Sequence, residues 1–233
     1  MRKFKNSFFF KYFGIGKKQL EKLIQDVNSG VEKDEKKHEL ALEKYVEELK
    51  NWDDLQNIAD GIEQNNPKSY HDALTYFNPF ADIGELGSQV GIKITDKCQI
   101  ELDVYVNDKE IIPDYELKLL ASGKLSKKKM TKSKFNELYQ DYVCSALIRV
   151  SRELFSYLPL DKVNVNAIGK ILNTKTGYIE DKVIVSTLMI EETIGQLNLD
   201  KIDPSDSMEN FIHNMNFSKL KGFKPVERIE ITD

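Results

Sequence analysis

The sequence has few of the residues that build metal and redox sites. Only two cysteines and three histidines occur among its 233 residues. Cys98 and Cys144 form no C-x-x-C motif, which is typical of a reduced intracellular protein. No histidine stands at ligand spacing from a cysteine, so the common zinc-binding patterns are excluded.

Long apolar runs are also missing. No stretch approaches the roughly 20 apolar residues that a membrane-spanning helix needs. Residues 1–16 begin with the basic and aromatic character of a signal peptide, but Lys11 interrupts the apolar run and no small-residue cleavage site follows. We therefore expect a cytoplasmic protein without a membrane span.

Nucleotide-binding and nucleophile motifs are absent from the sequence. The glycines of 84–91 form neither a P-loop nor a G-x-G-x-x-G motif, and there is no G-x-S-x-G elbow. The net charge of −4 argues against a protein that coats nucleic acid non-specifically. Charge is uneven, however, because residues 117–136 contain seven lysines and no acids, whereas residues 19–64 contain thirteen acids and six lysines.

The first 66 residues predict an arm followed by a helical appendage. Residues 1–16 mix aromatic and basic side chains, which predicts a strand packed on the domain or, alternatively, an arm that lies at an interface or stacks on nucleic acid. Residues 17–27 predict a short helix that the sequence NSG ends, and residues 32–64 predict a longer one. The apolar residues of the longer helix recur every three or four positions; they include Leu42, Tyr45, Leu49, Trp52 and Ala59.

The apolar positions of helix 32–64 allow two arrangements. With fewer than five clean heptads, they favour a helical hairpin packed on its own domain over an extended coiled coil. They are also the best candidate in the sequence for binding a protein partner or a second copy of the chain. A structural assembly protein acting through this helix is therefore one functional hypothesis.

Residues 67–233 predict an α+β domain. Alternation with a period of two predicts three strands, and a three-to-four-residue rhythm then predicts a helix that Ser133 caps and Pro159 ends. Two more strands follow, and a last helix begins at Ser205 or Asp206. The predicted strands lie near 89–95, 100–107, 111–119, 162–169 and 179–190. The order βββαββα after an N-terminal helical segment favours a mostly antiparallel sheet.

The second and third predicted strands carry an acidic face. A hairpin with a two-residue turn at 108–109 would match their apolar faces and oppose Glu101 to Glu116 and Asp103 to Asp114. Opposed like charges are unfavourable in a plain sheet. A bound divalent cation would reverse the sign of that interaction, since Mg²⁺ is held by one or two carboxylates with water and phosphate.

The segment 69–169, with its "PDYELK" stretch, resembles the PD-(D/E)xK nucleases, whose core runs helix, three strands, helix, strand. The resemblance implies that Asp103 and Glu116 hold Mg²⁺ and that these two residues and Lys118 are catalytic. Mg²⁺ is the only cofactor that we expect, and only for such a nuclease. The alternative interpretation is a solvated sheet face, because Glu, Asp and Lys are the default residues of an exposed strand.

The lysine-rich stretch after the third strand predicts a flexible basic loop. Its side chains are candidates for contacts with nucleic-acid phosphates, and the alternative is a loop that its charges merely keep soluble. The candidate residues are Lys124, Lys127, Lys128, Lys129, Lys132 and Lys134.

The stretches "ELYQDYVCSALIRVSRELFSYLP" and "DPSDSMENFIHNMNF" resemble segments of uncharacterised bacterial hypothetical proteins, which implies a bacterial origin and no particular activity. We therefore expect a cytoplasmic bacterial binding protein with a protein partner at helix 32–64 and nucleic acid as a second candidate partner. The overall pattern suggests a role in a defence or mobile-element system. The alternatives are the Mg²⁺-dependent nuclease and the structural assembly protein.

Overall fold

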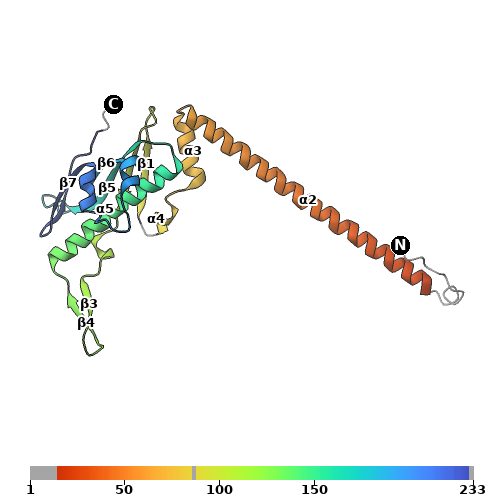
Figure 1. Ribbon diagram of the computed structural model, residues 1–233, viewed down its shortest axis with the longest axis horizontal. Helices are drawn as coiled ribbons and strands as arrows, with labels where there is room; N and C mark the ends of the chain where they lie inside the picture. The colour runs from red at the N-terminus through yellow and green to blue at the C-terminus, as the bar shows by residue number, and fades with distance from the viewer. Residues whose placement is uncertain (1–14, 86–87, 231–233) are drawn as a thin grey trace. The chain divides into compact units, whose positions relative to one another are not determined.

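A computed structural model describes residues 15–85 and 88–230 of the chain (Figure 1). The predicted N-terminal arm lies outside these residues except for its last two positions. The chain divides into two compact units, Met1–Asn57 and Ile58–Asp233. No helix among the described residues is both long enough and apolar enough to cross a membrane.

One helix, α2, runs without interruption from Ile15 to Glu63. The prediction of two helices separated at the sequence NSG is therefore wrong, and the helical hairpin that was favoured over an extended coiled coil does not form. Asparagine, serine and glycine inside a helix cost only about 0.5–1 kcal/mol each, which the helix-forming residues on both sides offset. Gly30 has no neighbouring atoms that a side chain would meet, so no close approach requires a glycine at this position.

The second unit is built on a six-stranded sheet with the order β1-β2-β5-β6-β7-β8. In this sheet only β2 and β5 run parallel, and all other neighbours are antiparallel. The predicted α+β class with a mostly antiparallel sheet is thus confirmed. The strands are β1 (Gln89–Ile94), β2 (Ile100–Tyr105), β5 (Lys162–Leu172), β6 (Ile179–Ile190), β7 (Ile212–Ser218) and β8 (Gly222–Lys224).

Helix α5, Lys132–Tyr157, packs its buried face against the sheet. A parallel pair such as β2 and β5 needs a long crossover connection, and α5 is part of it. The helix begins slightly earlier than predicted: Thr131, and not Ser133, is the N-cap, and its Oγ1 accepts a hydrogen bond from the Lys134 amide at 3.4 Å. The remaining helices are α3 (Pro67–Phe77), α4 (Ala81–Glu85) and α6 (Glu191–Gln196), with short 3₁₀ turns at Lys109–Ile111 and Asp206–Asn210.

The core lies between α5 and one face of the sheet. Its fully buried side chains come alternately from each central strand and from every third or fourth position of α5, as the two periodicities require. Several of them have no exposed surface; these are Ile100, Leu102, Val104, Val143, Leu147, Leu154, Val163 and Val165.

Two elements differ from the prediction near the middle and the end of the chain. β3, Tyr115–Leu119, was predicted as a longer strand paired with the second one, but it pairs with β4, Leu125–Lys129, in a separate two-stranded sheet. The residues of β4 were predicted to form a flexible loop. The predicted last helix is only the 3₁₀ turn at Asp206–Asn210, after which β7 and β8 complete the large sheet. Residues 212–218 alternate between exposed and half-buried positions, which is the strand period and not the helical one.

Candidate functional surfaces

The hairpin predicted to create a metal site does not form. Asp103 lies on β2 in the large sheet, whereas Glu116 lies on β3 in the two-stranded sheet. β2 pairs with β1 and β5, so Glu101 is not opposed to Glu116, and Asp103 is not opposed to Asp114. The prediction of the hairpin is wrong because matched apolar faces fit several partners equally well. The argument for a shared ion loses its geometric basis, and the catalytic roles remain a hypothesis.

Asp103 and Glu101 instead hold an arginine from the end of the chain. The guanidinium of Arg228 donates to both carboxylate oxygens of Asp103, at 2.6 and 2.8 Å, and to Glu101 at 2.6 Å. These bonds to Asp103 raise the pKa of Arg228, since they favour the charged guanidinium. We call this group the arginine clamp.

A buried polar network continues from the arginine clamp across β5 and β6. The amide nitrogen of Asn166 donates to Glu101 and to Asp103, each at 3.0 Å. Its amide oxygen accepts from the Ser186 hydroxyl at 2.7 Å, and that hydroxyl accepts from the Ile229 amide at 2.9 Å. The outer face of the sheet therefore fixes the segment around Arg228 through side chains of three strands.

Glu116 and Lys118 have different surroundings from those predicted. Glu116 forms an ion pair at 3.0 Å with Lys134, one of the lysines predicted to contact phosphate. Glu116 faces Lys128 across the two-stranded sheet. Lys118 faces Ser126 and is exposed. Glu116 is thus paired with a lysine of its own unit.

The other predicted phosphate-contacting lysines lie on or beside the β3–β4 hairpin, which we call the basic ribbon. Positions 127–129 are exposed lysines at the end of β4, and Lys124 directly precedes this strand. Lys132 follows the ribbon as the first residue of α5. The Lys127 ammonium lies 3.6 Å from the centre of the Tyr115 ring, a cation–π contact. The structure therefore brings most of these lysines together on a two-stranded ribbon.

The basic ribbon also exposes apolar side chains. Because side chains alternate across a strand, the three leucines of one of its faces share that face with Lys127 and Lys129. They are Leu117, Leu119 and Leu125, which are 59 to 67% exposed.

Helix α2 carries the largest set of exposed apolar side chains among the described residues. Each is 48 to 64% exposed, and they recur every three or four positions, so that they form one face of the helix. We call this set the apolar stripe: Leu20, Leu23, Ile24, Val27, Val31, Leu42, Tyr45, Val46, Leu49 and Trp52. A block of charged residues at 32–37 interrupts it.

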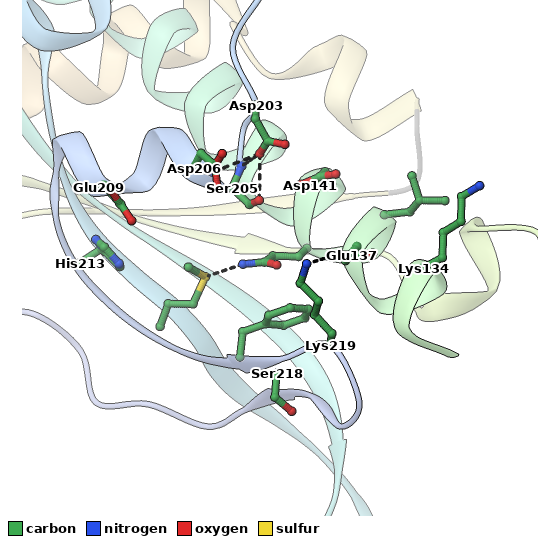
Figure 2. A pocket seen from close by; sticks show the side chains of 14 residues that line it. Lys134, Glu137, Asp141, Asp203, Ser205, Asp206, Glu209, His213, Ser218 and Lys219 are labelled. Carbon is green, nitrogen blue, oxygen red and sulfur yellow. Dashed lines mark hydrogen bonds and ion pairs between the residues drawn. The ribbon is translucent and has the colours of Figure 1, made fainter. Parts of the chain in front are cut away.

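A cleft of about 750 Å³ lies between the start of α5 and the segment leading into β7 (Figure 2). Figure 2 shows acidic, basic and neutral side chains in its walls, with Lys219 paired to Glu137 and Asp203 accepting a hydrogen bond from Ser205. The acidic residues are Glu137, Asp141, Asp203, Asp206 and Glu209.

Two acids of the cleft have shifted pKa values for different reasons. Burial raises the pKa of Asp141, because the charged form loses hydration. Hydrogen bonds from the backbone of Asp206 and from the Ser205 hydroxyl lower the pKa of Asp203. Asp203 Oδ1 accepts hydrogen bonds from the backbone amide of Ser205 at 2.9 Å and from that of Asp206 at 3.1 Å. This carboxylate therefore caps a turn. One acid of the cleft, Asp203, therefore stabilises a turn that forms part of the cleft wall.

Within residues 15–85 and 88–230, no three His, Cys, Asp or Glu side chains gather as metal ligands would. Comparison of the chain with models of protein families, with curated proteins and with solved structures found no match.

Proposed function

We propose that this chain is an interaction protein that assembles with further copies of itself through the apolar stripe of α2. The observation that supports this function is the stripe itself: ten large apolar side chains lie along one face of a 49-residue helix, and each is about half exposed. Patches of this kind mark interaction sites in soluble proteins.

The size of the stripe is sufficient for association. Burying the remaining exposed half of a large apolar side chain is worth about 1 kcal/mol, so two stripes together supply roughly 20 kcal/mol. Association costs about 4–15 kcal/mol for lost rigid-body freedom, and ordering side chains costs more. The difference is of the order that gives micromolar dissociation constants.

Sedimentation velocity of the full chain across a range of concentrations tests the proposal. The unmodified chain should pass from one copy to an assembly as concentration rises, and Leu49→Asp should remain a monomer because it puts a charge in the stripe. The matched control is Asn51→Asp, which introduces the same acid two residues further on at an exposed polar position. A monomer at every concentration in the unmodified chain would refute the function.

Nucleic-acid binding by the basic ribbon is a second candidate function. It is favoured by one observation: three consecutive exposed lysines stand on a two-stranded ribbon, an element that the major groove of duplex DNA admits. Lysines at phosphates release counterions, so binding of this kind weakens steeply with salt.

Fluorescence anisotropy with a labelled DNA duplex at increasing salt tests this second candidate. Replacing Lys127, Lys128 and Lys129 by glutamine should weaken binding and reduce the salt slope by about 0.9 for each phosphate that no longer meets a lysine. The control removes the same charge from three other exposed lysines, which are Lys162, Lys175 and Lys201. Equal effects of both triple variants would leave only a general charge effect and exclude the ribbon.

A further inference from the structure

We infer that the partner of the apolar stripe is a second α2 running antiparallel, in a register where opposed residues have numbers that sum to 69. The inference rests on the proposed function and specifies its geometry. It concerns only the described helix, whose side chains from Lys17 onward are exposed through its first half.

Four positions of each half of the stripe, with His38 counted in the second half, have a spacing that is the same in both directions. Leu20, Ile24, Val27 and Val31 follow each other by four, three and four residues. His38, Leu42, Tyr45 and Leu49 repeat the same four-three-four spacing after a step of seven. A four-three alternation is the seam of a two-helix coiled coil. An antiparallel partner presents the second series against the first with every step in phase.

In this register each apolar position of the first series meets an apolar or aromatic position of the second, except at one layer. That layer pairs Val31 with His38, next to the charged block. The opposed pairs are Leu20–Leu49, Ile24–Tyr45, Val27–Leu42 and Val31–His38. Between Val31 and His38, a step of seven residues interrupts the four-three alternation. This interruption falls at the centre of the pair, where the two-fold axis of such a dimer would pass, so the spacing within each half is unchanged.

The distribution of charge along the helix favours antiparallel over parallel pairing. Residues 17–26 contain three lysines and two acids, a net charge of +1, whereas residues 43–54 contain five acids and two lysines, a net charge of −3. Antiparallel copies place the positive segment beside the negative one. Parallel copies would place the two negative segments together, which costs stability in neighbouring helices.

The same register gives Trp52 a partner. The residue opposite Trp52 is Lys17, whose aliphatic stem can cover the indole while its ammonium lies over the ring face. Lys17 belongs to the basic start of the sequence, where residues 1–18 hold six cations and no acids. The acidic end of one stripe therefore meets the basic end of the other.

Pairwise disulfide formation in the full chain tests the register. Leu20→Cys and Leu49→Cys are purified separately, one with a mass tag, then mixed and mildly oxidised. The expected product is a covalent dimer of one chain of each kind. Leu20→Cys alone should give none, because in antiparallel copies its two thiols are about 44 Å apart at 1.5 Å per residue.

The matched control is the mixture of Lys22→Cys and Glu47→Cys. These positions also sum to 69 but lie on the outward side of each helix, so they should form no more covalent dimer than the unmodified chain. The native thiols of Cys98 and Cys144 are buried, and the unmodified chain measures their contribution.

The outcomes distinguish the inference from the proposed function. A covalent dimer of mixed composition, with none from Leu20→Cys alone, supports the inference. A dimer from Leu20→Cys alone shows parallel pairing and overturns the inference while the proposed function stands. An assembly seen by sedimentation with no crosslink from the mixture also overturns the register. A monomer at every concentration overturns the proposed function itself.

Discussion

Replacing Arg228 by alanine should destabilise the second unit measurably. The arginine clamp consists of three short charge-assisted hydrogen bonds to two carboxylates, each about one quarter exposed. Bonds to charged groups contribute about 1.5–3 kcal/mol when buried, but exposed ion pairs contribute under about 1 kcal/mol. Because the Arg228 side chain is 41% exposed, we expect a loss of about 1–2 kcal/mol. Without it, Glu101 and Asp103 would keep the shared Asn166 amide, and Glu101 would keep its longer ion pair with Lys93 at 3.9 Å.

The assay is urea unfolding followed by circular dichroism at low salt, since guanidinium would itself screen the pair. Glu227→Ala is the control, because Glu227 uses its backbone carbonyl and not its side chain to accept from Asn214. A cycle with Asp103→Asn separates the pairwise term from general effects of substitution. A loss below about 0.3 kcal/mol in Arg228→Ala, or equal losses in Arg228→Ala and Glu227→Ala, would show that the clamp does not stabilise the fold.

Groups with shifted pKa values give two further predictions. Burial raises the pKa of Asp141 above its ordinary 3.8, so the folded state binds this proton more tightly than the unfolded state, and ionisation costs stability at higher pH. Asp141→Asn should therefore raise the melting temperature at pH 7, and the difference in melting temperature from the unmodified chain should vanish below about pH 4. The exposed Asp200→Asn is the control and should show no such pH-dependent difference. A difference in melting temperature that stays constant across pH would contradict the reasoning. Burial also raises the pKa of Cys98, and it raises the pKa of Cys144 to about 12. An aromatic disulfide reagent at pH 8 should therefore label neither thiol in the folded chain and both thiols in urea. Fast labelling of the folded chain would contradict the buried positions of the two cysteines.

The elements that were predictable from the sequence are those with a long and regular period. β5 and β6 begin within a residue of their predicted starts, and α5 covers the predicted helix. β1 and β2 are also where the alternation placed them. β2 buries one face and α5 buries one side, so their periods of burial match their periods of apolar residues. β5 is buried on both faces and β1 is at most half-buried, yet the apolar alternation of both was still sufficient to locate them.

The pairing partner of each strand, and the short elements without a regular period, could not be predicted from the sequence in this way. β2 and β5 pair across a long stretch of chain, and nothing local to β2 distinguishes β5 from β3. The sequence LSKKK lacks apolar alternation, yet it forms β4 because its partner β3 and the turn at Gly123, with a φ of 76°, hold it. The turn-capping residues at 203–206 resemble the start of a helix. They led to the prediction of a helix there, although the residues of β7 that follow alternate as a strand does.

The candidate surfaces show the same limit. The lysines of the basic ribbon were visible as a charge cluster, but their position on a ribbon was not. The apolar stripe was partly visible, although the expected break at the sequence NSG hid the continuity between its two halves. Arg228 was missed entirely, because one arginine in a mixed tail has no periodic neighbours to mark it, and its partner Asp103 had been assigned a different role.

The arginine clamp also sets an order in time. Arg228 is added to the chain 125 residues after Asp103, which at 5–20 residues per second is about 6–25 s of synthesis. During that interval β1, β2, α5, β5 and β6 can assemble, but Glu101 and Asp103 lack the Arg228 guanidinium, and Glu101 has the longer ion pair with Lys93 at 3.9 Å. The contribution of the arginine clamp to stability is therefore absent until the segment around Arg228 has been made, and this segment is the part that completes the outer face of the sheet.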